Sequence, residues 1–379
     1  MTERPLRALI RLVAGIGLAA LLCTGPAVGQ PAPSVVDSVG RALADGPGGA
    51  VIGLLHDDGT SVRAYGAVDS TGTPPTARTL FEIGSVTKTF TGLLLAERIE
   101  RGRLRPTTPV RALLPDSVRW SLADSVRATG TDSTLTLVHL ATHRAGLPRL
   151  PPNLNVNASP WDPYAAYGDS ALYAFLDGHT LPRAPGAKYE YSNLGMGLLG
   201  HLLARQADTT YAALVRQRIA KPLGLSDTRI RLTANQEERV AQGYTRLGAP
   251  APPWHFDALA GAGALRSTAA DMLAYLRAHR RALRAAPDTA STLERAMQRA
   301  LTPRAQAGSH HSRVGLAWHQ TTRDGHRIVW HNGGTGGFRS FAGLNRATGR
   351  GVVVLVNMAL SSETVDEAAR RLLKHLRPD

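Results

Sequence analysis

The feature that most constrains the fold of this 379-residue chain is the position of its strand-like segments, which lie near both ends. Near the N-terminus, residues 50–56 and 62–68 form two short apolar runs joined by turn-forming residues. Four more runs lie near the C-terminus, at residues 314–321, 327–331, 339–345 and 351–357. Their short, glycine-rich connections are typical of antiparallel hairpins. The two ends of the chain are therefore expected to share one antiparallel sheet.

Helical patterns flank and separate these strands. Residues 34–44 and 363–376 have the apolar spacing of amphipathic helices, and residues 80–290 consist mainly of helical segments separated by loops rich in proline and glycine. The pattern predicts an α+β fold, in which an antiparallel sheet from both chain ends is flanked by helices and accompanied by a mostly helical second region. We expect the sheet region to comprise residues 30–79 and 291–379, with a functional site where it meets the helical region.

The first 29 residues have the features of a secretory signal peptide. Basic residues between Arg4 and Arg11 precede an apolar stretch over residues 12–23, and small residues follow up to Gly29. The apolar stretch is shorter than the roughly 20 residues needed to span a bilayer. We therefore expect cleavage near Gly29 and no stable membrane anchor afterwards.

The mature chain, residues 30–379, contains no cysteine, because the single cysteine of the sequence is Cys23. It can form no disulfide, and it has neither a catalytic thiol nor a cysteine-ligated metal. These features predict a periplasmic or secreted protein.

Arginine supplies nearly all of the positive charge. Basic residues outnumber acidic ones by 44 to 29, which gives a formal net charge of +15. The arginine clusters at residues 101–105 and 277–284 lack the interleaved aromatic residues that stacking on bases requires, so no nucleic-acid partner is expected. Only four of the basic residues are lysines: Lys88, Lys188, Lys221 and Lys374. In such a chain, a lysine indicates a task that arginine cannot perform, such as the loss of a proton.

Ser85 and Lys88 form a Ser-x-x-Lys pattern at the predicted start of a helix. Residues i and i+3 share one helix face, so the lysine amine is expected beside the serine hydroxyl. Serine is a weak nucleophile until a nearby group takes its proton, and a lysine desolvated against Phe81, Phe90 and Leu93 can do so. The helix N-terminus also offers backbone N–H groups to developing negative charge.

Two further patterns complete a candidate catalytic constellation. Tyr191 offers a second proton carrier, whose phenol we expect to be acidified by an adjacent lysine ammonium, and the Asn193 amide can donate to and accept from a substrate. The segment from His331 to Gly337 ends a predicted strand, and its glycines allow a backbone edge to approach a substrate closely. The N–H of Gly334 would then complete an oxyanion hole with that of Ser85.

In this order and spacing, the three patterns resemble those of the serine β-lactamase and penicillin-binding protein superfamily, in particular the branch with class C β-lactamases, D-alanyl-D-alanine carboxypeptidases and related esterases. The resemblance covers nearly the whole mature chain and includes residues 135–148, 222–228 and 261–272. It implies a β-lactamase/transpeptidase-like fold and no metal or organic cofactor. It also assigns Ser85 as the acylated nucleophile, Lys88 as its proton partner and Tyr191 as the second acid/base.

The third pattern departs from that of true class C β-lactamases, which carry Lys-Thr-Gly where this chain has His-Asn-Gly. The resemblance gives substrate-binding or oxyanion positions to Asn193, His331, Gly333, Gly334 and Thr335. A fixed ammonium is replaced by an imidazole that is mostly neutral near pH 7. This favours peptidase, amidase or esterase activity over efficient β-lactam hydrolysis.

The sequence thus predicts an exported serine hydrolase that acts through a Ser85 acyl-enzyme. Its substrate is expected to be a small molecule or peptide with an amide or ester bond: a D-amino-acid peptide, a β-lactam or a carboxylic ester. The alternative is a catalytically weak relative that binds cell-wall peptides or penicillins. The loops at residues 148–163 and 243–263 are expected to line the pocket.

Two other patterns have competing interpretations. Residues 195–200 match the dinucleotide-binding pattern GxGxxG, but the preceding segment is polar and the chain continues as a helix, which favours close helix packing. His139 and His143 have the i, i+4 spacing of a zinc pair but no third ligand, so no metal site is expected.

Overall fold

The computed structural model describes residues 33–128, 134–154, 160–323 and 325–376. The predicted signal peptide and its cleavage site lie outside the described residues.

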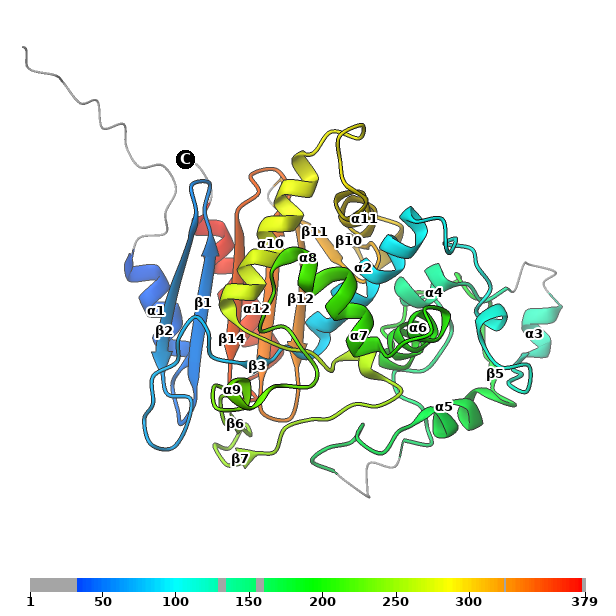
Figure 1. Ribbon diagram of the computed structural model, residues 1–379, viewed down its shortest axis with the longest axis horizontal. Coiled ribbons are helices and arrows are strands. Elements are labelled where there is room, and N and C mark those ends of the chain that lie inside the picture. The colour runs from blue at the N-terminus through cyan, green and yellow to red at the C-terminus, as the bar shows by residue number, and fades with distance from the viewer. Residues whose placement is uncertain (1–32, 129–133, 155–159, 324, 377–379) are drawn as a thin grey trace, which may run out of the picture.

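One eight-stranded antiparallel sheet forms the centre of the fold (Figure 1). The strand order is β2-β1-β14-β13-β12-β11-β10-β9, so the N-terminal hairpin pairs with the last strand of the chain. β1 (Gly49–Leu55) lies antiparallel to β14 (Gly351–Val356), with Ile52 opposite Val354. The other strands are β2 (Thr60–Gly66), β9 (Ala305–Ala307), β10 (Ser309–Val314), β11 (His319–Arg323), β12 (His326–Gly334) and β13 (Arg339–Asn345). The predicted α+β fold, with one antiparallel sheet from both chain ends, is confirmed.

Alternate residues of the central strands enter two different cores, because successive side chains of a strand point to opposite faces. Ile52 packs with α1 and α12, whereas its neighbour Val51 belongs to the larger core that includes residues of α2 and α10. Figure 1 shows α10 and α12 on opposite faces of the sheet. The helices involved are α1 (Pro33–Leu43), α2 (Thr87–Glu100), α10 (Ala269–Arg284) and α12 (Ser362–His375).

The remaining helices lie mainly beside the sheet (Figure 1). They are α3 (Asp124–Arg127), α4 (Leu137–Ala141), α5 (Asp169–Leu176), α6 (Asn193–Gln206), α7 (Tyr211–Val215), α8 (Lys221–Leu223), α9 (Ala234–Glu237) and α11 (Thr292–Ala300). Short helical turns are η1 (Gly84–Val86), η2 (Val110–Leu113), η3 (Arg216–Ala220) and η4 (Ala260–Ala262). Two-residue strands form three small pairs: β3 (Phe81–Glu82) with β8 (Arg266–Ser267), β4 (Ser121–Leu122) with β5 (Thr180–Leu181), and β6 (Gly243–Tyr244) with β7 (Pro250–Ala251).

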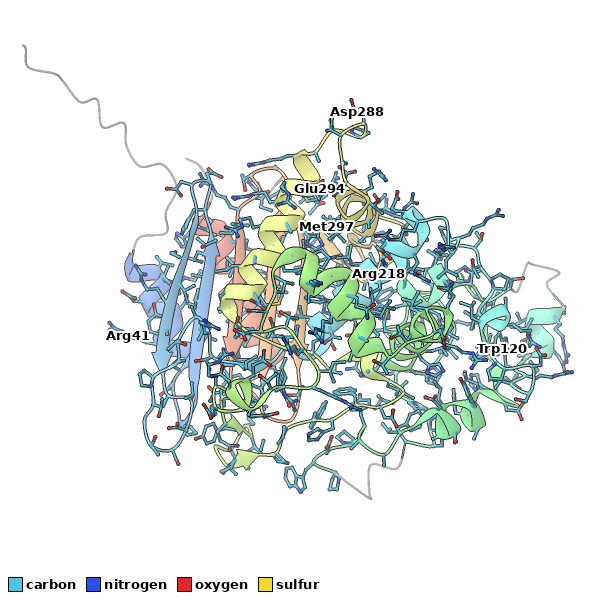
Figure 2. The ribbon with its side chains drawn as sticks, in the orientation of Figure 1. Arg41, Trp120, Arg218, Asp288, Glu294 and Met297 are labelled. Atoms are coloured by element: carbon cyan, nitrogen blue, oxygen red, sulfur yellow. The ribbon has the colours of Figure 1, made fainter. Side chains whose placement is uncertain are left out.

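α11 anchors α2, the helix that carries Lys88. Met297 of α11 is buried in the main core, and Glu294 accepts from Arg281 of α10 at 2.8 Å (Figure 2). On its other side, Arg299 donates to Glu100, the last residue of α2, at 2.5 Å. α2 is thereby fixed relative to α10 and the sheet.

The predicted strand at residues 314–321 is wrong, because the chain turns inside it. β10 ends at Val314, β11 begins at His319, and Ala317 between them has a φ of 66°. The N–H groups of Leu316 and Ala317 donate to carbonyl oxygens near the C-terminal ends of α11 and α4, at 2.9 Å each. Although its composition resembles that of a strand, the apolar run therefore forms a buried turn that packs against two helices.

The glycines at residues 195–200 allow α6 to pack closely against η4. A Cβ on Gly197 would lie 2.9 Å from the Leu259 Cα atom, and one on Gly200 would lie 2.8 Å from the Gly261 Cα atom. Both distances are shorter than real Cβ contacts, so the two backbones can meet only because side chains are absent. Close helix packing is therefore confirmed as the reason for this pattern.

Replacing Gly200 by alanine tests this contact. Alanine is the better helix former by about 1 kcal/mol, but the clash is with backbone, which cannot rotate away. Overpacking of this kind costs about 1–3 kcal/mol. We expect Gly200→Ala to lower the free energy of unfolding in a urea titration, whereas Gly59→Ala, at an open position, leaves it nearly unchanged. Equal stabilities of the two variants would contradict the packing argument.

Candidate active site

Ser85 lies in a tight turn between β3 and α2. The α-helix was expected to open at Ser85, but it begins at Thr87, and Ser85 belongs to the preceding 3-10 turn η1. Gly84 has a φ of 46°, in the region that favours glycine. The turn leaves Ser85 partly exposed while its neighbours Gly84 and Val86 are buried.

Lys88 lies beside the serine, as the i, i+3 spacing predicts. Its Nζ atom donates to Ser85 Oγ at 2.9 Å and to the carbonyl oxygen of Ala262 in η4 at 2.6 Å. The side chain is completely buried. Burial, together with the positive charge of Arg149, holds the pKa of Lys88 well below its usual value.

Tyr191 completes this group, but its acidity differs from the prediction. Burial raises the pKa of Tyr191 to about 12, and its hydrogen bond with the Ser85 side chain offsets this only in part. The expected acidification required a charged lysine, whereas burial disfavours the charged form of Lys88 as well. The Lys88 Nζ atom lies 5.0 Å from the centre of the Tyr191 ring. The tyrosine is therefore a neutral phenol in this site.

Asn193 is held at the start of α6. Ser192 caps this helix, because its Oγ atom accepts from the N–H of Gly195 at 2.8 Å. The Asn193 Nδ2 atom donates to the Tyr164 hydroxyl at 3.0 Å. Its Oδ1 atom is buried and has no hydrogen-bond partner within the part of the chain that the structure describes. This amide oxygen is thus available to a donor on a bound molecule.

The end of β12 lies directly against the serine turn. A Cβ on Gly84 would be 2.6 Å from Gly334 N, and one on Gly333 would be 3.0 Å from Ser85 N. Gly333, Gly334 and Thr335 all line the same cavity as Ser85. The two backbone N–H groups proposed from the sequence are therefore brought close together.

His331 does not lie on the cavity surface, unlike the other predicted substrate-binding residues. It is completely buried and does not line the cavity, whereas the next residue, Asn332, does. Successive residues of β12 alternate in orientation. His331 lies on the face of the catalytic group, where it packs against Tyr191 and His319 with ring centres 6.2 and 5.0 Å away, whereas Asn332 faces α12 and donates to Asp366 at 2.9 and 3.0 Å. The expected contact of the imidazole with substrate is corrected accordingly.

Three histidines surround the Lys88–Tyr191 pair. The His143 ring centre lies 4.5 Å from that of Tyr191, and the His319 and His331 ring centres are 5.0 Å apart. Burial first, and then neighbouring positive charges that include Lys88, lowers the pKa values of all three, to about 4 for His319. The imidazoles are therefore neutral at physiological pH.

The cavity at this site has a volume of about 560 Å³. Both predicted loops contribute, through Arg149 and Leu150 from the first and Trp254 from the second. The sequence reasoning missed several individual residues of its wall: Arg149, Tyr164, Trp254, His319 and Arg339. Arg149 directly follows the segment of residues 135–148 that carries part of the family resemblance, which was the available signal.

No group of three or more metal-ligating side chains could hold an ion within the described ranges. His139 and His143 are used locally instead. The Nδ1 atom of His139 accepts from Thr136 N at 3.3 Å, and that of His143 accepts from Ser192 N at 3.1 Å. Searched over the same residues, no helix has the length and apolarity needed to cross a bilayer.

A serine hydroxyl beside a buried lysine and a tyrosine, at the junction of an antiparallel sheet and a helical region, defines a serine hydrolase of the Ser-x-x-Lys class. The chain belongs to the β-lactamase family, whose sequence profile matches residues 37–377.

Individual relatives agree with this assignment. A β-lactamase of Pseudomonas fluorescens is 26% identical over 367 residues, which cover 86% of this chain and 92% of the relative. The D-alanyl-D-alanine-carboxypeptidase/endopeptidase AmpH of Escherichia coli is 27% identical over 248 residues, but the match spans only 61% of that protein and 65% of this chain. A solved β-lactamase/D-alanine carboxypeptidase from Pseudomonas syringae has the same fold, with a TM-score of 0.76, 22% identity and coverage of 91% of this chain and 99% of that chain.

The buried lysine makes stability depend on pH. Because the folded state lowers the pKa of Lys88, the unfolded chain binds more protons between that lowered pKa and about 10.4. Stability therefore rises with pH over this window. Lys88→Met removes this dependence. The free energy of unfolding of the variant, relative to that of wild type, should therefore be more favourable at pH 7 than near pH 10.

Urea unfolding of both proteins across this range measures the difference. Lys188, which is exposed, provides the control, and Lys188→Met is measured over the same pH range. A constant difference between wild type and Lys88→Met would contradict a neutral buried lysine.

Proposed function

We propose that the protein hydrolyses an amide or ester through an acyl-enzyme on Ser85. The observation that carries this proposal is the 2.9 Å hydrogen bond between Lys88 Nζ and Ser85 Oγ, made by a lysine whose burial favours the neutral amine. A neutral Lys88 takes the serine proton as Oγ attacks the substrate carbonyl. Arginine in the same place would keep its proton.

The tetrahedral intermediate would be stabilised by the backbone N–H groups of Ser85 and Gly334. The close contact between the serine turn and β12 supports this role, because fixed donors aimed at a developing oxyanion need no rearrangement during the reaction. Asn193 would accept a substrate N–H through its unpartnered Oδ1 atom.

Tyr191 would act as a proton donor. With a pKa of about 12, it retains its proton at neutral pH and can pass it to the leaving group while the serine proton moves through Lys88. Water then attacks the ester carbonyl of the acyl-enzyme, and the same groups, working in reverse, release Ser85.

A peptide with a free terminal carboxylate fits the cavity best. Two arginines, Arg149 and Arg339, and no acidic residue are among the described residues of its wall. Arg339 donates to the carbonyl oxygens of Thr335 and Phe338, whereas the Arg149 guanidinium has a ring contact with Tyr191 at 5.1 Å. Within the described residues the exposed Arg149 side chain forms no hydrogen bond, so we assign the substrate carboxylate to it. The named activity of AmpH on D-alanyl-D-alanine peptides is consistent with this class of substrate.

We further propose that the protein works outside the cytoplasm. Support comes from the N-terminal sequence, with its basic residues, short apolar stretch and small residues near Gly29.

Substitution of the nucleophile and its partner tests the mechanism. Ser85→Ala should abolish turnover, by about 10⁴-fold or more, while the protein stays folded. Lys88→Arg should reduce kcat by about 10²–10⁴-fold, because the charge remains but the basicity is lost. Lys188→Arg, at an exposed lysine, should behave as wild type.

The assay should combine nitrophenyl esters, a D-alanyl-D-alanine peptide and a chromogenic cephalosporin with labelling by a fluorophosphonate or fluorescent penicillin. A folded protein that carries no label on Ser85 would refute the acyl-enzyme. It would favour the alternative, a catalytically weak protein that binds cell-wall peptides or penicillins.

The role of Arg149 is tested with one peptide in two forms, the free acid and its C-terminal amide. Arg149→Gln should lower kcat/KM for the acid by about tenfold, because hydrogen bonds to charged groups contribute about 1.5–3 kcal/mol and this side chain is exposed. The value for the amide should change little. The exposed Arg103→Gln is the matched control, and equal losses on both peptides would exclude a carboxylate contact.

A further inference from the structure

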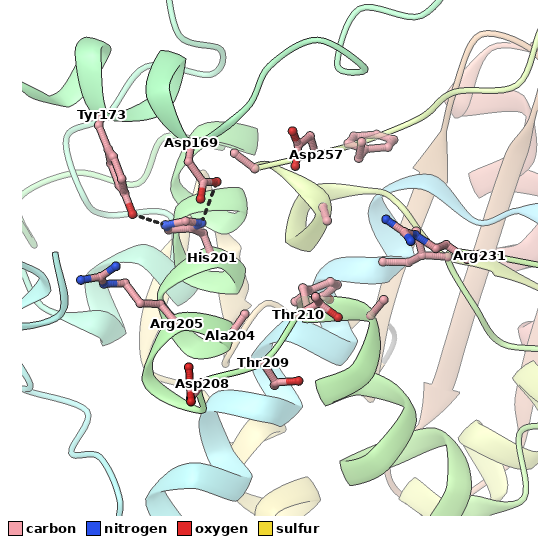
Figure 3. A pocket seen from close by; sticks show the side chains of 16 residues that line it. Asp169, Tyr173, His201, Ala204, Arg205, Asp208, Thr209, Thr210, Arg231 and Asp257 are labelled. Atoms are coloured by element: carbon pink, nitrogen blue, oxygen red, sulfur yellow. Dashed lines mark hydrogen bonds and ion pairs between the residues drawn. The ribbon is translucent and has the colours of Figure 1, made fainter. Parts of the chain in front are cut away.

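A second cavity, larger than the catalytic one, lies in the helical part of the molecule. Its volume is about 760 Å³, and residues from α5, α6, α7, η4 and three loops line it (Figure 3). Ser85, Lys88 and Tyr191 do not belong to its wall. Cavities of about 300–1,000 Å³ accommodate small organic ligands.

The cavity combines an apolar floor with a rim that carries both signs of charge. Tyr211 and Ala260 are buried, and the ring of Phe256 is half-buried. The exposed charged residues at the rim are Asp169, Arg205, Asp208, Arg231 and Asp257. Figure 3 shows Asp257 and Arg231 extending from separate segments, with Arg205 and Asp208 on the α6 side. A ligand with an apolar group and both charges would match this arrangement.

Several of these charges have no protein partner. Within the described ranges, Arg231 and Asp208 form no ion pair or side-chain hydrogen bond. Asp257 also forms neither, although it is close enough for its charge to act on His201. Asp169, in contrast, belongs to a fixed chain: Tyr173 and His201 are hydrogen-bonded at 2.7 Å, and His201 Nδ1 lies 3.4 Å from Asp169 Oδ1 (Figure 3). One wall is therefore held rigid by its own contacts, while the opposite charges on the other sides remain available to a ligand.

The floor of this cavity is also a wall of the catalytic centre. Phe256 stacks on Tyr164 with ring centres 4.5 Å apart, and the Tyr164 hydroxyl accepts from Asn193 at 3.0 Å. Ala260 begins η4, whose last residue, Ala262, accepts from Lys88. The middle of the segment of residues 254–262 thus lines the second cavity, while residues near both of its ends contact the catalytic site.

A third connection runs through the floor itself. The hydroxyl of Tyr211 lies 2.7 Å from Thr91 Oγ1, and Thr91 donates to the carbonyl oxygen of Gly261 at 2.8 Å. Thr91 lies on α2, one helical turn after Lys88. A molecule packed against Tyr211 and Phe256 would therefore be linked by these contacts to α2 and η4, the two elements that position Lys88.

We propose that this cavity binds a zwitterionic small molecule of the amino-acid or short-peptide class, and that its occupancy changes turnover at Ser85. The ligand carboxylate pairs with Arg231, its ammonium group with Asp257 or Asp208, and its apolar side chain packs on Phe256 and Tyr211. Binding in the cavity is coupled to turnover if the ligand binds more tightly to one position of residues 254–262 than to another. Only such a difference in affinity can shift the populations of the two positions. The binding claim is independent of the proposed function, whereas the coupling claim rests on it.

Binding is tested with three probes that share one ring: L-phenylalanine, its amide and its N-acetyl derivative. Calorimetric titration of the whole protein should show the zwitterion binding about tenfold more tightly than either singly charged form. Arg231→Gln should weaken the binding of L-phenylalanine by about tenfold. Arg103→Gln, which changes an exposed arginine that does not line the cavity, should have no effect on this affinity. Equal affinities for the three probes, no saturable binding, or an unchanged Arg231→Gln variant would overturn the proposal.

Coupling is tested with a neutral nitrophenyl ester at saturating concentration. L-phenylalanine should change kcat by about twofold or more in wild type, which corresponds to about 0.4 kcal/mol. It should have no effect in Arg231→Gln, whose basal kcat should match wild type. Purely competitive inhibition that persists in Arg231→Gln would place the probe in the catalytic cavity and refute the coupling. If no ester, peptide or cephalosporin is turned over, the proposed function fails, and the titrations still decide the binding claim.

Discussion

The hydrogen bonds of the buried Lys88 amine are the interaction on which the site depends. Its Nζ atom lies 2.6 Å from the Ala262 oxygen and 2.9 Å from Ser85 Oγ, in a position closed to solvent. A carboxylate partner would stabilise the ammonium form and raise the lysine pKa. A backbone carbonyl accepts a hydrogen bond without adding a full negative charge, so it satisfies the amine while leaving the neutral form accessible. Arg149, the one charged neighbour that contributes to the shift, acts in the same direction as burial.

The position of the Ala262 carbonyl depends in turn on a contact between two backbones. α6 approaches η4 closely because Gly200 meets Gly261 without side chains. α6 also begins with Asn193, so one helix positions a substrate-facing amide at its start and supports the lysine acceptor near its middle. The same η4 turn borders the second cavity through Ala260. Packing, catalysis and the proposed second site therefore share one short segment.

The sequence predicts those parts of the structure that depend on local spacing. The sheet from both chain ends follows from the period of its strands, and the contact of Ser85 with Lys88 follows from their i, i+3 spacing. The acidity of Tyr191 was predicted with the wrong sign, because spacing reveals neighbours but not burial. The cavity wall could not be predicted, since Arg149 and Trp254 come from loops whose paths are set by tertiary contacts. His331 was expected to contact substrate because its motif was identified, but the motif does not reveal that the imidazole is buried against Tyr191 and His319.

The burial of His331 changes what the third motif can contribute. A lysine that reached the cavity from this strand would offer a charge to a substrate anion, whereas His331 is buried among His319, His143 and the Tyr191 ring. A proton on any of these imidazoles would place a second positive charge near Lys88 in a medium that solvates charge poorly. Neutral histidines therefore keep the surroundings of the lysine compatible with its neutral form. An anion-binding charge must then come from elsewhere. Among the described residues of the cavity wall Arg149 meets that requirement, because it is exposed and its guanidinium lies 5.1 Å from the centre of the Tyr191 ring.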